Sequence, residues 1–85
     1  MTRADVVALL RDLLGEILEL DPHELDVEQD LIDDLDTDSL QRLDLMAEVE
    51  HRLGVRLDAR AWREARSLTE LTDLTLQALA ESTPR

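Results

Sequence analysis

Aliphatic residues recur every three or four positions along most of this chain, which is the spacing of one face of an α-helix. The first such run contains Val6, Leu10, Leu13 and Ile17. The chain has no Phe, no Tyr and a single tryptophan, Trp62, so its core must be built from Leu, Val, Ile, Ala and Met. No strand-like alternation accompanies this pattern. The sequence therefore predicts an all-α fold.

Four helices are expected, three long ones and a short third one, packed as a four-helix bundle. Thr2 and Asp5 supply a cap and a favourable first-turn acid for the first helix. Gly54 is placed to end the second helix, and Ser67 to Glu70 has the spacing of a capping box at the start of the fourth. The expected helical ranges are about 3–18, 39–53 and 59–64, and the fourth helix runs from Ser67 through Leu79.

The same pattern predicts which side chains face the core. The inner side of the second helix is expected to carry Leu43, Met46, Ala47, Val49 and Leu53. The long connection that opens at Asp21 and Pro22 is expected to fold back onto the bundle through Leu25, Val27, Leu31, Ile32 and Leu35. Gly15 costs the first helix up to ~1 kcal/mol relative to alanine unless close packing requires a glycine there.

The length of 85 residues predicts one domain spanning 1–85, with an ordered core from about 2 to 80 and a tail over 81–85. Cysteine is absent, which excludes disulfides, thiolate catalysis and zinc–thiolate sites and fits a cytoplasmic location. No apolar run approaches the ~20 residues of a membrane span, and the N-terminus lacks the apolar region of a signal peptide. We expect a cytoplasmic monomer that does not bind membranes.

Acidic residues dominate the charge, because 21 acids against nine arginines give a formal net charge of −12. This charge disfavours nucleic acid and anionic membrane surfaces, and it favours a partner with a basic patch. The distribution is uneven. Between Asp30 and Glu50 eight acids face only Arg42, and between His51 and Arg66 five arginines face two acids. Most charge runs are solvated surface, but this acidic run surrounds a single serine.

Ser39 stands between Asp38 and Leu40, where the acidic run passes into the second helix. The simplest interpretation is a helix cap. Asp38 and Gln41 have the spacing of a capping box, and either Asp38 or Ser39 is a suitable capping residue.

A calcium loop is a second interpretation of the same segment. Asp34, Asp36 and Asp38 copy the first three ligand positions of an EF-hand. The sixth position of such a loop is then Ser39 instead of glycine, and the twelfth is Leu45 instead of glutamate. We therefore predict no metal site.

A catalytic serine is a third interpretation, and it needs a general base. The only histidines are His23, in the long connection, and His51, about three helical turns beyond Ser39. Neither is placed to activate the hydroxyl, and both are expected to be plain surface residues. We predict that the chain alone is not an enzyme.

Residues 35–57, LDTDSLQRLDLMAEVEHRLGVRL, resemble the core motif of the acyl carrier protein family, in which Asp-Ser-Leu heads the second helix. The stretch that leads from Asp21 and Pro22 to the serine is similar to the same family. Downstream, the apolar pair Val55 and Leu57 follows the second helix at the expected distance. The resemblance extends to about residue 79 and implies a four-helix bundle with a short third helix.

The resemblance also implies a cofactor and partners. Ser39 would carry a 4′-phosphopantetheine arm added by a separate phosphopantetheinyl transferase, with acyl groups held as thioesters on the terminal thiol of the arm. The partners implied are acyl-loading and acyl-processing enzymes with basic docking patches. The docking face would consist of Asp38, Leu40, Asp44, Met46 and Glu48.

Three departures from the family pattern indicate a carrier with particular partners, in polyketide or other secondary metabolism more than in fatty-acid synthesis. Asp36 replaces the glycine that the family commonly has two residues before the Asp of the Asp-Ser pair. It therefore either stiffens the loop or adopts a turn conformation that glycine usually supplies. Gln41, Arg42 and His51 dilute the acids of the second helix, and arginines are numerous around the third helix.

Two other functions stay open at the level of sequence. An aminoacyl or peptidyl carrier shares the bundle and the modified serine. An unmodified acidic helical module would bind a basic partner and use Ser39 only as a cap.

Overall fold

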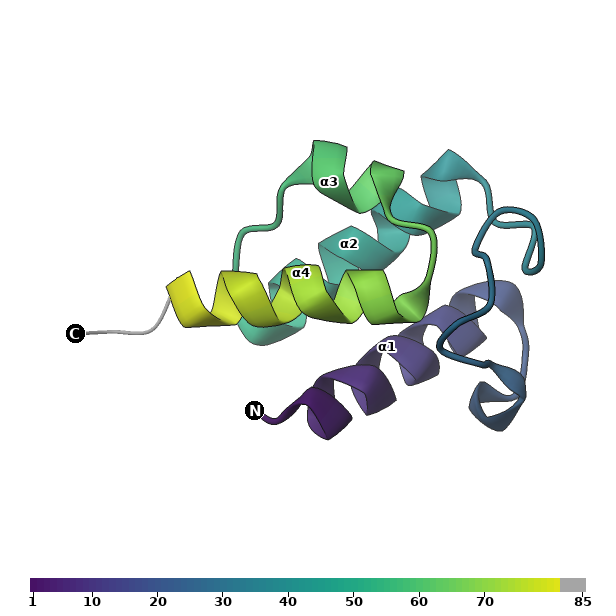
Figure 1. Cartoon of the computed structure of the whole chain (residues 1–85), viewed down its shortest axis with the longest axis horizontal. Helices are drawn as coiled ribbons and strands as arrows, with labels where there is room; N and C mark the ends of the chain where they lie inside the picture. The colour runs from purple at the N-terminus through teal and green to yellow at the C-terminus, as the bar shows by residue number, and fades with distance from the viewer. Residues whose placement is uncertain (82–85) are drawn as a thin grey trace.

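The computed structural model describes residues 1–81 as four α-helices and one short 3₁₀ helix (Figure 1). Their bounds are α1 Arg3–Leu18, η1 Pro22–Glu24, α2 Ser39–Leu53, α3 Ala59–Glu64 and α4 Leu68–Glu81. The four predicted α-helices are confirmed, including the short third one, whereas η1 has no counterpart in the prediction. Glu81, predicted for the tail, is instead the last residue of α4. The rest of the predicted tail, 82–85, lies outside the described residues.

The ends of the helices follow the predicted capping residues with one difference. Thr2 and Asp5 form a reciprocal box at α1, in which the Asp5 N–H donates to the Thr2 hydroxyl at 3.2 Å and the Thr2 N–H donates to the Asp5 carboxylate at 3.0 Å. Gly54 ends α2 in the left-handed conformation, at φ +65°. At α4 the Ser67 hydroxyl accepts from the Glu70 N–H at 3.2 Å. The Glu70 carboxylate accepts from the residue before Ser67, so only half of that predicted box forms.

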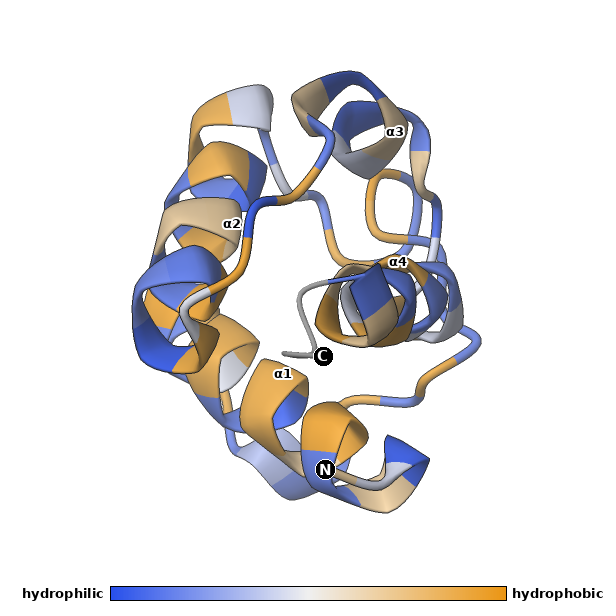
Figure 2. Ribbon diagram, turned by 90° about the vertical axis from the view of Figure 1, so that its left-hand side faces the viewer, coloured by the Kyte–Doolittle hydropathy of each residue, from blue (hydrophilic) through white to orange (hydrophobic). Residues whose placement is uncertain are grey.

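The helices enclose one apolar core, and Figure 2 shows the hydrophobic stretches of α1, α2 and α4 turned toward the middle of the bundle. α1 packs against α2, α4 and η1, and α3 packs against α2 and α4. No helix within residues 1–81 is both long and apolar enough to span a membrane. The buried apolar residues are Val6, Leu10, Leu13, Leu14, Leu25, Leu31, Leu45, Val49, Val55, Trp62, Ala65, Leu68, Leu71 and Ala78.

The face of α2 that meets the core differs from the prediction by part of a turn. Arg42, Leu45 and Val49 are its buried residues, whereas Ala47, predicted for the inner side, is exposed. The buried positions keep helical spacing, but one of them carries a charge, and a pattern of apolar residues does not count it. A long arginine stem covers apolar surface all the same. The other residues predicted for the inner side, all half-buried, are Leu43, Met46 and Leu53.

The connection between α1 and α2 folds back onto the bundle as predicted, with one exception. Leu25 and Leu31 are buried, and Val27 and Leu35 pack half-buried against the same core. Ile32 is 36% exposed, so its predicted burial is wrong. Leu31 and Ile32 are neighbours in a tight turn, and only one of two such neighbours can face the bundle.

Gly15 is explained by the turn that follows α1. The chain leaves the helix through Glu19, in the left-handed conformation at φ +58°, and the Leu20 N–H donates back to the Gly15 carbonyl at 2.8 Å. A Cβ on Gly15 would lie 2.8 Å from the Leu20 carbonyl oxygen and 3.2 Å from Cγ of Pro22. The close packing that justifies a glycine inside this helix is therefore present.

Gly15→Ala is expected to lower the free energy of unfolding by roughly 1–2 kcal/mol, because the new methyl group meets a backbone oxygen that moves only with the whole turn. This is a net loss, because the cost of the clash outweighs the gain of ~1 kcal/mol that alanine otherwise brings to a helix interior. Urea denaturation followed by circular dichroism measures the difference. Glu16→Ala, at the exposed neighbouring position, is the control and should stay within ~0.5 kcal/mol. A more stable Gly15→Ala protein would contradict the close approach.

Candidate functional site

The start of α2 is defined by Asp38 rather than by Ser39. Asp38 is the N-cap residue, and its carboxylate accepts from the Gln41 N–H at 2.7 Å. The Gln41 side chain returns the bond by accepting from the Asp38 N–H at 3.0 Å. Of the two capping residues that the sequence leaves open, the structure selects Asp38. Ser39 therefore does not cap α2.

Ser39 is the first residue of α2, and its side chain is exposed. Within residues 1–81 its hydroxyl makes no hydrogen bond, and the neighbouring capping bonds join Asp38 and Gln41 to each other. The next residue, Leu40, is 67% exposed and leaves an apolar side chain beside the hydroxyl. The arrangement leaves a primary hydroxyl exposed at the N-terminal end of a helix, where anions are stabilised.

Asp36 settles one of the alternatives that the sequence leaves open. Its φ is +55°, so it adopts the left-handed conformation that glycine usually supplies. Asp and Asn tolerate this region better than other non-glycine residues. The departure from the family pattern is thus accommodated within the same turn geometry.

The turn before Ser39 is held by Thr37, which is buried. Its N–H and its hydroxyl both donate to the Leu31 carbonyl, at 3.0 Å and 2.7 Å. Nη1 of Arg42 donates in turn to the Thr37 carbonyl at 2.9 Å and to the Thr37 hydroxyl oxygen at 3.0 Å. The Arg42 side chain therefore joins the long connection to the first turn of α2.

These hydrogen bonds extend into a closed circuit that we call the Thr37 network. The Leu31 N–H donates to the Arg66 carbonyl at 2.7 Å, between α3 and α4, and Nε1 of Trp62 in α3 donates to the Arg42 carbonyl at 2.8 Å. Trp62 and Arg66 lie on the same short segment, so the circuit returns to its start. The members of the network are Leu31, Thr37, Arg42, Trp62 and Arg66.

Arg66, a member of the Thr37 network, also forms ion pairs at the surface of the domain. The Arg66 guanidinium lies 2.8 Å from the Asp30 carboxylate and 3.2 Å from that of Asp33. Asp30 also accepts backbone N–H groups of its own turn, from Ile32 at 2.9 Å and from Asp33 at 2.8 Å. The Asp33 N–H first, and Arg66 after it, lower the pKa of Asp30 below its usual value. The ionised form of the Asp30 carboxylate is thus the form that these bonds stabilise.

Most of the acids around Ser39 have structural partners, which the sequence does not reveal. Asp30 and Asp33 bind Arg66, and the Asp34 carboxylate accepts from the Asp30 N–H at 2.9 Å. Further along α2, the carboxylate of Glu50 accepts from the Leu57 N–H at 2.8 Å. Within residues 1–81 no group of three or more His, Cys, Asp or Glu side chains is arranged to hold a metal ion.

The predicted docking residues divide between the surface and the core. Leu40, Asp44 and Glu48 are exposed, and Met46 is half-buried against the core. Asp38 is exposed, but its carboxylate is used by the cap. An open groove between α1 and α2 brings Asp44 and Glu48 together with a third acid, Glu16, which the sequence pattern alone does not connect to them. The lining residues are Leu13, Glu16, Ile17, Asp44, Ala47, Glu48 and Arg52.

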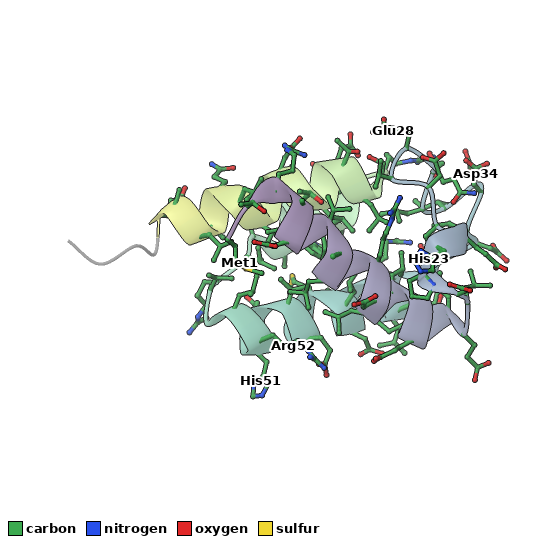
Figure 3. All side chains as sticks on the ribbon, turned by 90° about the horizontal axis from the view of Figure 1, so that it is seen from below. Met1, His23, Glu28, Asp34, His51 and Arg52 are labelled. Carbon is green, nitrogen blue, oxygen red and sulfur yellow. The ribbon has the colours of Figure 1, made fainter. Side chains whose placement is uncertain are left out.

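The two histidines are surface residues, as predicted. His23 and His51 are both exposed, and Figure 3 shows His51 pointing away from the bundle on α2 and His23 in the connection after α1. Within the described residues neither forms a hydrogen bond with Ser39.

Comparison with known sequences finds carrier proteins. A family model for the phosphopantetheine attachment site matches residues 8–75. The chain is 40% identical over 62 residues to polyketide-8 synthase acyl carrier protein 2 of Streptomyces avermitilis, covering 73% of this chain and 68% of that protein. It is 25% identical over 84 residues to the meromycolate extension acyl carrier protein of Mycobacterium leprae, covering 99% of this chain and 72% of that protein.

Solved structures match the bundle as well. The 3,7-dioxo-octyl actinorhodin acyl carrier protein from Streptomyces coelicolor superposes with a TM-score of 0.72 at 28% identity, covering 98% of this chain and 95% of that chain. The HMG-ACPI domain from the CurA module of Lyngbya majuscula superposes with a TM-score of 0.78, covering 96% of this chain and 83% of that chain. At 19% identity the second match supports the fold alone.

The fold and the family match define a small helical carrier domain. The chain belongs to the acyl carrier protein family, whose phosphopantetheine attachment domain covers residues 8–75. The cofactor of this family is covalent 4′-phosphopantetheine, added by a phosphopantetheinyl transferase, and its members work with acyl-processing enzymes. The resemblance based on the Asp-Ser-Leu motif and the expected all-α bundle are confirmed.

Proposed function

We propose that Ser39 is the attachment residue and that residues 1–85 act as one carrier domain, holding acyl intermediates as thioesters on the arm. The observation that carries this proposal is the exposed, unbonded hydroxyl of Ser39 at the first position of α2, with Asp38 capping the helix in its place. A serine needed only as a cap would be engaged in that role.

The residues present fit the phosphopantetheine group. Its phosphodiester would sit at the N-terminal end of α2, where free N–H groups and the helix dipole stabilise an anion by roughly 0.3–1 kcal/mol. The chain has no cysteine, and the arm supplies the thiol that carries the acyl group. The chain's own contribution is to hold the hydroxyl outward in a defined turn.

The names of the relatives support a role in polyketide or other secondary metabolism. One relative is a polyketide synthase carrier, and one solved neighbour at 28% identity is the actinorhodin carrier. The carriers of meromycolate extension are related at lower identity. We propose acyl groups rather than aminoacyl groups as the cargo. Cytoplasmic location and a monomeric state stay predictions.

The partner-docking surface is proposed to be the exposed side of α2 near the groove to α1. Leu40 offers an apolar contact beside Ser39, and Asp44 and Glu48 offer negative charge. Glu48 lies 3.5 Å from Arg52, but both side chains are about half exposed, so the pair is weak and available to a competing cation. A loading or processing enzyme with a basic patch fits this surface, and charge would act chiefly on its rate of association.

Incubation with coenzyme A and a broad-specificity phosphopantetheinyl transferase is expected to add one phosphopantetheinyl group, measured by intact mass and located by peptide mapping. Ser39→Ala should abolish the gain and leave helicity intact, because the Asp38 cap does not depend on the serine. Ser67→Ala, which removes a capping hydroxyl at α4, should still be modified and serves as the control. An unmodified wild type, or modification that survives in Ser39→Ala, would contradict the assignment.

Charge reversal at Asp44 or Glu48 is expected to raise KM for the transferase several-fold without unfolding the domain, because exposed substitutions usually shift stability by no more than ~0.5 kcal/mol. Steering between opposite charges weakens with salt, so the effect should shrink as salt is raised. Steady-state kinetics at two salt concentrations measure it. Glu81→Lys, at the exposed end of α4, is the control. Equal effects at Glu48 and Glu81 would assign the change to net charge and exclude a docking face.

A further inference from the structure

Arg42 is an unusual residue at the start of α2, because it is the only charged side chain among the buried residues of the described range 1–81. It is 8% exposed, and within residues 1–81 no carboxylate lies in ion-pair distance of its guanidinium. Its Nε is buried with no hydrogen-bond partner in the same part of the chain. A buried arginine with this incomplete set of partners is costly, and an aliphatic residue would fill the position more cheaply.

Arg42 forms hydrogen bonds with the two residues that precede Ser39. Its side chain donates through Nη1 to the carbonyl and hydroxyl oxygens of Thr37, at 2.9 Å and 3.0 Å. Its backbone N–H donates to the Asp38 carbonyl at 3.2 Å. Arg42 thus holds the two residues before the serine, one by its side chain and one by its main chain. Ser39 is inside the loop that these bonds close.

The carbonyl of Arg42 connects the same turn to α3. It accepts from Nε1 of Trp62 at 2.8 Å, and the Trp62 side chain is fully buried. The first turn of α2 is therefore bonded to α3 as well as to the connection. No exposed residue of α2 has such a set of contacts.

We propose that Arg42 is a positioning residue for the modification of Ser39, fixing the hydroxyl relative to the surface of α2 on which the transferase docks. This inference rests on the proposed attachment at Ser39. A transferase that binds Leu40, Asp44 and Glu48 meets the hydroxyl at a set distance only if the turn before it is rigid. Arg42 acts on Ser39 through the bonds of its side chain to Thr37, which hold the turn before the serine.

The expected signature is a change in kcat with little change in KM. Arg42→Met keeps the length of the side chain and removes its donors, so the Thr37 carbonyl is released while the docking residues stay in place. Misplacing a reacting group by a fraction of its contact distance slows a reaction strongly, and we expect kcat of modification to fall about tenfold. Arg42→Lys keeps a donor that can reach Thr37 and should restore most of the rate.

Arg63→Met is the matched control, because it makes the same substitution and the same change of net charge at an exposed arginine of α3. It should leave kcat and KM at their wild-type values. Circular dichroism and the fluorescence of Trp62 establish that each variant is folded at the assay temperature. If Arg42→Met does not fold, Thr37→Val removes the bridging hydroxyl with little change of shape and should lower kcat in the same direction by a smaller factor.

The possible results distinguish the role of Arg42 from the attachment at Ser39. Wild-type kcat in a folded Arg42→Met protein, a loss confined to KM, or an equal loss in Arg63→Met would overturn the role of Arg42 while leaving the attachment at Ser39 in place. A wild type that is never modified at Ser39 would overturn the proposed function, and this inference with it. A selective loss of kcat that Arg42→Lys rescues supports positioning.

Discussion

The hydrogen bonds of Thr37 are the constraint on which the attachment turn depends. The connection of about 20 residues between α1 and α2 contains one turn of 3₁₀ helix and no other helix or strand, so its polar groups depend on bonds within turns and on side chains. Thr37 makes such bonds to Leu31 within the connection and to Arg42 in α2. Leu31 is in turn tied to Arg66, and Arg42 to Trp62. The connection is thereby fixed to α2 and to the segment between α3 and α4 without adding secondary structure.

The acidic character of this region consequently has two origins. Asp30, Asp33, Asp34 and Asp38 are used to build the turns and the cap. Asp44 and Glu48 remain on the exposed side of α2, where solvent reaches them. The charge of the segment therefore overstates the charge available for recognition. A small domain gains from this arrangement, because the same residue type stabilises the loop and keeps the surface acidic.

The helices were predictable from the sequence because their signals are local. Thr2 with Asp5, and Asp38 with Gln41, satisfy N–H groups only three residues away, so spacing is enough to place the ends of α1 and α2. The candidate site was identified by its motif for the same reason. The burial of Arg42 was not predictable from the spacing of apolar residues, because the residue is charged and its carbonyl is paired with Trp62, which is 20 residues further along the chain. The partners of Asp30 and the left-handed Glu19 likewise depend on the folded chain.

The central claim is that the turn before Ser39 is rigid in the unmodified protein, held by the Thr37 network. Native-state hydrogen exchange of the wild type tests it most directly, because Leu31 and Thr37 donate their N–H groups within that network although neither lies in a helix. The account predicts that these two amides are protected with opening free energies close to those of Leu45 and Val49 in the core of α2. Exchange of Leu31 and Thr37 at the rates of a free peptide, while α2 stays protected, would contradict it.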